Sequence, residues 1–274
     1  MTIEEGQVAI VTGAASGIGK ALSLALARRG LRVVLTDVEA AALGVATEEA
    51  EAIYPGASGI ELDVSDPEAF ARVSDRVIDE YGEYHVVCNN AGISLPFRPL
   101  WEATAAEWRW IEGVNLTGVV NGIATLVPHL VERGDGHVVN VASMAGATAI
   151  PYNGLYNATK HAVVSLSETL AAELEQRAPG VAVTIVYPTL TATNIGNSAR
   201  NRPSTGPSAG PSRPSSIARP PAIADQGELV WMSADDVATA TLAAMDARRL
   251  HLLLGPDARQ RAEQWMDRLV VDLP

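Results

Sequence analysis

The chain has 274 residues, 47% of them hydrophobic, which suits one large α/β domain. A formal net charge of -12, with no basic cluster, argues against binding to nucleic acid or to an anionic membrane surface. The single cysteine, Cys88, excludes an internal disulfide and is expected to pack in the core. Because the N-terminal residues lack a signal-peptide pattern and no unbroken apolar run approaches ~18 residues, we expect a cytoplasmic protein.

The first pattern along the chain is a strand, a glycine turn and a helix. A β-rich run over residues 7–11 leads into the turn TGAASGIG at 12–19, and a helical pattern follows over 20–29. Glycines allow a tight turn and let a phosphate approach the helix N-terminus, where free N–H groups and the helix dipole favour an anion. An ordinary Gly-rich turn would look the same in isolation, but the flanking strand and helix favour dinucleotide binding.

The next expected strand, over residues 32–36, ends at Asp37. Dinucleotide-binding folds place an acidic residue about 20 residues past the glycine turn, against the adenosine ribose. A carboxylate there accepts a hydrogen bond from the ribose 2′-hydroxyl and repels a 2′-phosphate, so Asp37 favours NAD over NADP. The alternative is that Asp37 only caps the helix expected to start near Glu39.

Strand and helix patterns then alternate to the C-terminus. Further strands are expected over residues 59–62, 84–88, 136–141, 182–187 and 251–254. Further helices are expected over 39–54, 67–81, 105–132, 153–177, 234–249 and 257–269, with a break or bend near Pro128 in the third of these. This alternation predicts a single Rossmann-type domain with a doubly wound parallel sheet.

The ligand of such a sheet lies at the carboxyl ends of its strands. Polar or turn residues follow six of the expected strands and should therefore meet at one edge of the sheet. They are the glycine turn, Asp37, Asp63, Asn89, Ser143 and Pro188.

Residues 200–222 differ in composition from the rest of the chain, being rich in Pro, Ser, Gly and Arg with little that could form a core. One interpretation is a passive surface insertion. The other is a flexible lid, extending over about 194–232, that closes over the substrate.

Tyr156 and Lys160 lie four residues apart within the helix expected over 153–177, so their side chains leave the same face. A nearby ammonium favours the phenolate and lowers a tyrosine pKa from its usual value near ~10. Such a pair could move a proton near neutral pH. Only Lys20 and Lys160 are lysines, which suggests a role that needs a compact ammonium. By spacing alone, an idle surface pair is the favoured interpretation, and the rest of the chain has to decide between the two.

Taken in order, the glycine turn, the run from Asn89 to Gly92, Asn115, Ser143 and the Tyr156–Lys160 pair resemble the short-chain dehydrogenase/reductase family, in its shorter branch. The resemblance extends over about residues 6–255. It implies that Ser143 polarises the substrate carbonyl and that Tyr156 is the general acid in reduction and the base in oxidation. It further implies that Lys160 lowers the tyrosine pKa and binds the nicotinamide ribose, while Asn115 holds a water that links Lys160 to solvent.

The same resemblance implies a set of cofactor-binding residues. They are Gly13, Ser16, Gly17, Ile18, Gly19, Asp37, Asp63, Val64, Asn90, Ala91, Gly92, Tyr156, Lys160, Pro188, Thr191 and Thr193. Neither Ser16 nor Val38 is basic, which again favours NAD. One departure is Thr189, which follows Pro188 where the family usually has glycine.

The expected reaction is the NAD-dependent interconversion of a secondary alcohol and its ketone. The alternatives are an NADP-dependent ketone reductase and a dinucleotide-binding protein without turnover. A mostly apolar, uncharged lining predicts a neutral, hydrophobic substrate, unless arginines of the 194–232 segment contribute. The expected substrate residues are Ser143, Leu95, Met144, Asn153, Tyr156 and Leu190, and Tyr187 is expected to face the substrate as well. We see no metal-ligand spacing, and the resemblance implies a homo-oligomer, a dimer or a homotetramer.

Overall fold

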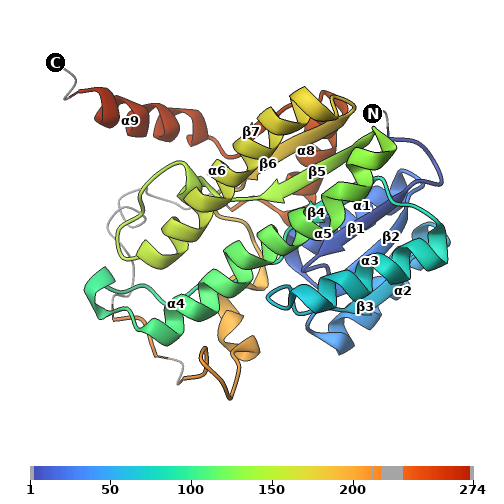
Figure 1. Cartoon of the computed structure of the whole chain (residues 1–274). Coiled ribbons are helices and arrows are strands. Elements are labelled where there is room, and N and C mark those ends of the chain that lie inside the picture. Colours follow the sequence, from blue (N-terminus) through green and yellow to red (C-terminus); the bar gives the residue numbers. More distant parts are fainter. Residues whose placement is uncertain (1–2, 211–212, 217–230, 272–274) are drawn as a thin grey trace.

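The computed structural model describes residues 3–210, 213–216 and 231–271. Within this part of the chain, parallel strands form one seven-stranded sheet in the order β3-β2-β1-β4-β5-β6-β7 (Figure 1). The strands are β1 (Val8–Thr12), β2 (Arg32–Asp37), β3 (Ser58–Glu61), β4 (Val86–Asn89), β5 (Gly136–Val141), β6 (Val181–Tyr187) and β7 (His251–Leu253). The order reverses between β1 and β4, which confirms a doubly wound Rossmann-type sheet and places the ligand crevice at this switch point.

Helices cover both faces of the sheet. On one face lie α1 (Gly17–Arg28), α2 (Ala40–Ile53) and α8 (Ala234–Asp246), and on the other lie α3 (Pro67–Tyr81), α5 (Gly118–Arg133) and α6 (Gly154–Arg177). Successive strand residues point to opposite faces, so Val8 and Ile10 pack into one core cluster and Ala9 and Val11 into the other. This two-sided burial explains why the strand sequences are almost continuously apolar.

The helix starts follow from local capping chemistry. Asp66 accepts from the backbone N–H of Glu68, with Pro67 as the first residue of α3. Ser233 accepts from the N–H of Asp236 at the start of α8. These starts agree with the sequence pattern, whereas α8 ends at Asp246 rather than at Arg249.

The long helix expected over 105–132 departs from its prediction. It consists of α4 (Ala105–Glu112), a π-helical turn (Gly113–Thr117) and α5, and Pro128 lies inside α5 without ending it. The helix is therefore not broken at Pro128, and α5 stays packed through Leu126, Val127 and Leu130 around the proline. The π turn instead carries Asn115, and π turns frequently occur at functional sites.

By length and hydropathy alone, the continuous helical stretch Ala105–Arg133 would qualify as a membrane-spanning helix. Core helices pass the same test, and 44% of its most apolar window is buried within this fold. After β7, the helix α9 (Ala258–Val270) extends away from the sheet in Figure 1.

Candidate active site

A cavity of about 310 Å³ runs along the carboxyl ends of the strands. It brings together Ser143 and every residue expected to bind the cofactor except Gly19. The residues at the ends of separate strands therefore meet in one cavity, as the strand topology predicts. Cavity residues that the sequence did not indicate include Glu39, Arg109 and Trp110, whereas Ser198 and Arg200 come from the segment expected to form a lid.

The glycine turn forms one wall of the cavity. Gly13 and Gly17 have φ angles of +65° and +56°, and a Cβ on Gly19 would overlap the carbonyl oxygen of Gly13. Side chains are therefore disfavoured at Gly13 and Gly17 and excluded at Gly19. α1 begins at Gly17 with no acidic residue in its first turn, so its N-terminal N–H groups suit a pyrophosphate.

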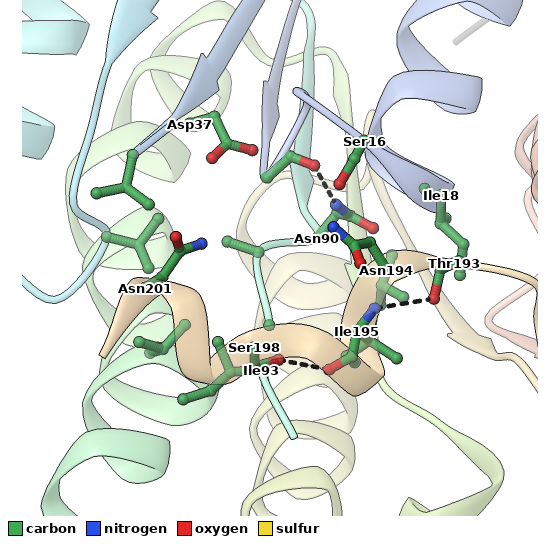
Figure 2. A pocket seen from close by; sticks show the side chains of 18 of the residues that line it. Ser16, Ile18, Asp37, Asn90, Ile93, Thr193, Asn194, Ile195, Ser198 and Asn201 are labelled. Atoms are coloured by element: carbon green, nitrogen blue, oxygen red, sulfur yellow. Dashed lines mark hydrogen bonds between the residues drawn. The ribbon is translucent and has the colours of Figure 1, made fainter. Parts of the chain in front are cut away.

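Asp37 holds two backbone segments while its carboxylate lines the cavity. Oδ2 accepts from the N–H of Ala15 and Oδ1 accepts from the N–H of Glu39, both at 3.0 Å. Figure 2 shows this carboxylate across the cavity from Asn201. Asp37 thus holds the glycine turn and the segment before α2, whose N-cap residue is Glu39, so it lines the cavity without capping that helix.

Tyr156 and Lys160 lie on successive turns of α6, and Ser143 follows β5. The Lys160 side chain is buried, its Nζ donates to the carbonyl oxygen of Val141 at 2.9 Å, and Nζ lies 5.7 Å from the centroid of the Tyr156 ring. Ser143 Oγ accepts from the N–H of Ala145 at 3.1 Å. Ser143, Tyr156 and Lys160 all line the cavity at the carboxyl ends of the strands.

Burial controls the ionisation of this group. It raises the pKa of Tyr156, an effect that the hydrogen bond with Ser143 opposes. Burial also lowers the pKa of Lys160 to about 8. The direction of the Tyr156 pKa shift is opposite to the one expected from the sequence, because burial of the phenol outweighs the hydrogen bond with Ser143.

Asn115 lies beneath the cavity and does not line it. Its Oδ1 accepts from the N–H of Ile93 at 2.8 Å, and its Nδ2 donates to the carbonyl of Ile93 at 2.9 Å and to Thr159 Oγ1 at 3.3 Å. A Cβ on Gly92 would lie 3.6 Å from both Asn115 Oδ1 and Lys160 Nζ. Asn115 thus ties the segment after β4 to α6, beside the lysine.

The first part of the expected lid is an ordered 3₁₀ helix, η4 (Asn194–Asn201), which crosses the cavity (Figure 2). On one side, Ser94 N–H donates to Ser198 Oγ at 3.1 Å and Ser94 Oγ donates to the Ile195 carbonyl at 3.0 Å. On the other side, Arg200 Nη2 lies 2.5 Å from Glu39 Oε1. This segment is therefore held at both rims of the cavity.

Residues 213–216 are held as well, whereas residues 217–230 of the expected lid lie outside the described residues. Arg213 and Arg98 lie 3.7 and 3.6 Å from the carboxylate of Glu107, which is almost fully buried on α4. Burial acts to raise the pKa of Glu107, but hydrogen bonds from Thr104 and the two guanidinium groups hold it below the usual value. Arg213 of the 194–232 segment is thus held by an ion pair with a buried carboxylate.

The expected substrate residues are only partly brought together. Leu95 and Asn153 line a small neighbouring cavity beside Tyr156, and Met144 is buried in the core. Tyr187 is turned away from the cavity: its ring packs in the core and its hydroxyl lies 3.0 Å from His251 Nδ1. The expectation for Tyr187 is therefore wrong, because a strand buried on both faces gives no sequence signal for the direction of one side chain.

Thr189, the departure from the family pattern, is accommodated by a glycine. Gly255 has a φ of +110°, and a Cβ on it would lie 2.7 Å from Thr189 Cγ2. The extra side chain thus packs against Gly255 at the end of β7 while Thr189 still lines the cavity. Among the described residues, no group of three or more His, Cys, Asp or Glu side chains could hold a metal ion.

A doubly wound sheet with a glycine turn before α1, an acid at the end of β2, and Ser143, Tyr156 and Lys160 on the same cavity defines a dinucleotide-dependent oxidoreductase. The sequence profile described as short chain dehydrogenase matches residues 7–204. The chain belongs to the short-chain dehydrogenase/reductase family, whose cofactor is NAD or NADP.

Similar proteins support this assignment. The C alpha-dehydrogenase of Sphingobium sp. is 32% identical over 268 residues, which cover 97% of this chain and 86% of that protein. The 1-deoxy-11-beta-hydroxypentalenate dehydrogenase of Streptomyces exfoliatus is 39% identical, with 66% of each chain covered. A short-chain dehydrogenase/reductase from Burkholderia phymatum, solved in complex with NAD, superposes with a TM-score of 0.88 at 33% identity, covering 100% of this chain and 98% of that one.

Proposed function

We propose that this protein is an NAD-dependent dehydrogenase that interconverts a secondary alcohol and its ketone. The observation that carries the proposal is that Ser143, Tyr156 and Lys160 line the same cavity as the glycine turn and Asp37. Bound NAD would accept the hydride from the alcohol carbon. The residues of this chain would bind the two reactants, orient them and move the hydroxyl proton.

Tyr156 is the proton acceptor in oxidation and the donor in reduction. Tyr156 lines the cavity, and its hydroxyl forms a hydrogen bond with the side chain of Ser143. Ser143 Oγ already accepts from the N–H of Ala145, so its one proton can be donated to the Tyr156 oxygen or, when substrate is bound, to the substrate oxygen. A placed acid or base of this kind typically contributes about 10²–10⁴-fold to the rate.

Lys160 supplies a positive charge beside Tyr156 and is the group proposed to bind the nicotinamide ribose. Asn115 fixes the loop beside it through both backbone groups of Ile93. Thr191 and Thr193 line the cavity and are proposed to contact the nicotinamide end, while Asp63 and Val64 flank the adenine. The lining beside Tyr156 includes Trp110 and Val114, which supports a hydrophobic substrate, with Arg109 as a charged neighbour.

The preference for NAD rests on Asp37. Replacing Asp37 with alanine should lower the ratio of kcat/KM for NAD to that for NADP by about tenfold or more, since about 1.4 kcal/mol of charge repulsion corresponds to a factor of ten. Asp37→Asn should lower the ratio as well, because it removes the same charge while its amide oxygen can still accept from the N–H of Ala15, so it separates loss of charge from loss of this hydrogen bond. Steady-state rates with both cofactors measure the ratio. Equal use of NADP by the unchanged protein would contradict this role for Asp37 and favour the ketone-reductase alternative.

Turnover itself is tested by a screen of secondary alcohols and ketones with NAD and NADP, monitored by the absorbance of the reduced cofactor. Reduction of NAD by a hydrophobic secondary alcohol is the expected result. Cofactor binding without turnover of any substrate would instead favour a non-catalytic dinucleotide-binding protein.

A further inference from the structure

The end of the cavity beside Asp37 contains a guanidinium from the lid. Arg200 of η4 and Glu39 at the start of α2 both line the cavity. Arg200 Nη2 lies 2.5 Å from Glu39 Oε1, and Nε lies 3.1 Å from each Glu39 oxygen. Both side chains are about three-quarters buried, with 26% and 27% of their surface exposed. The pair is therefore a two-pronged contact, more shielded from solvent than an ordinary surface ion pair.

Arg200 is positioned by its own segment as well as by Glu39. Its Nη1 donates to the carbonyl oxygens of Asn197 at 2.7 Å and Asn194 at 3.2 Å. These two bonds do not involve Glu39. The guanidinium should therefore keep its place on the cavity wall when the charge of Glu39 is removed.

Glu39 is also coupled directly to the residue that is proposed to contact the ribose. The backbone N–H of Glu39 donates to Asp37 Oδ1 at 3.0 Å, and Glu39 Oε1 accepts from Asn201 Nδ2 at 2.9 Å. The hydrogen bond from Arg200 lowers the pKa of Glu39, so its carboxylate is ionised at neutral pH. Asp63 also lines the cavity, and its Oδ1 is held by Ser65.

This arrangement has two carboxylates, Asp37 and Glu39, against one guanidinium, Arg200. A phosphate on the ribose 2′-oxygen would be repelled by the net negative charge of this group. It could not pair with the guanidinium of Arg200, because that guanidinium is already paired with Glu39. Arginine is the side chain best suited to bind phosphate through two parallel hydrogen bonds. Without the charge of Glu39, Arg200 would be available to such a phosphate.

We propose that Glu39 is a second cofactor-selecting residue: it masks Arg200, a latent phosphate ligand carried by the lid, and thereby adds to the rejection of a 2′-phosphorylated cofactor. The proposal rests on the proposed preference for NAD. It extends that preference beyond Asp37, because it makes η4 a part of the adenosine-binding site.

The test compares adenosine 2′,5′-bisphosphate with adenosine 5′-monophosphate as probes, with binding measured by calorimetry on the full chain. In Glu39→Gln, the Kd of the bisphosphate should fall about tenfold, the factor expected when one charge repulsion of about 1.4 kcal/mol is removed. The Kd of the monophosphate should change little. In the double variant Glu39→Gln with Arg200→Gln, the gain for the bisphosphate should disappear. Glu49→Gln is the matched control, because it removes a carboxylate from the Lys20–Glu49 ion pair, outside the cavity.

Two results would overturn the proposal in distinguishable ways. If the unchanged protein binds both probes equally, the preference for NAD fails, and the role of Glu39 fails with it. If the unchanged protein prefers the monophosphate but Glu39→Gln shifts both probes by the same factor, or shifts neither, the NAD preference stands and the masking role is wrong. An equal change in the two Kd values would show that the Glu39–Arg200 ion pair only holds η4 in place.

Discussion

Tyr156→Phe is expected to lower kcat by about 10²–10⁴-fold, the usual contribution of a placed general acid or base. Phenylalanine keeps the ring that packs beside Ile93, Trp110 and Ile111, and it removes only the hydroxyl that moves the proton. The Kd for NAD should therefore change little, and the loss should appear in kcat rather than in KM. Stopped-flow turnover and calorimetric NAD binding measure the two quantities separately.

Tyr54→Phe is the matched control, since Tyr54 follows α2 and does not line the cavity. It should retain full activity. Survival of most of the activity in Tyr156→Phe would show that another group transfers the proton. A parallel loss of NAD binding would show that the phenol serves mainly to bind the cofactor.

Lys160→Met is expected to abolish efficient turnover and, at pH about 7, to stabilise the protein without cofactor by about 1–3 kcal/mol. The side chain is 3% exposed, and burial lowers its pKa from 10.5 to about 8. A pKa difference of one between the folded and unfolded chain corresponds to about 1.36 kcal/mol, so keeping this ammonium buried costs on the order of 3 kcal/mol. Part of that gain is offset in the variant, because the hydrogen bond to the Val141 carbonyl is lost.

The pH dependence of stability gives a second measurement. Between pH of about 8 and 10.5, the unfolded chain holds a proton on Lys160 that the folded chain has released. This group's contribution to the free energy of unfolding therefore rises with pH through that window, and the full cost is present below it. Urea unfolding at several pH values should show this rise in the unchanged protein and not in Lys160→Met.

Lys20→Met is the control for this series. Lys20 is the other lysine of the chain and forms a partly exposed ion pair with Glu49. Its loss should leave the pH dependence between about 8 and 10.5 in place. A Lys160→Met protein that is less stable at pH 7 and keeps the same pH dependence would contradict the buried-charge cost.

Much of the site could be predicted from the sequence because strand ends converge in a parallel sheet. Asp37, Ser143 and Pro188 are far apart in the chain, yet each lies at or just past the end of a strand and each lines the cavity. The Tyr156–Lys160 pair followed from helical spacing. Spacing could not show the effect of burial on this pair. Burial raises the pKa of Tyr156 and lowers that of Lys160, so both neutral forms are favoured.

Other features depended on contacts between distant segments. Tyr187 lies on a strand buried on both faces, where alternation carries no signal, and only packing against the neighbouring core shows that it turns away from the cavity. A proline usually interrupts a helix, but α5 continues through Pro128 because the residues on either side of it are packed in the core. The π turn at Asn115 has no comparable sequence pattern.

The sequence by itself determined the order of strands and helices, the glycine turn and the residues at the strand ends, because these depend on local periodicity and backbone preference. Only the tertiary structure decided how the cavity is closed. The pair between Glu39 and Arg200 joins residues 161 positions apart, and it forms because η4 crosses the sheet edge at the end of β2. Sequence patterns describe neighbours along a strand or helix, whereas this contact depends on where the whole fold places two loops.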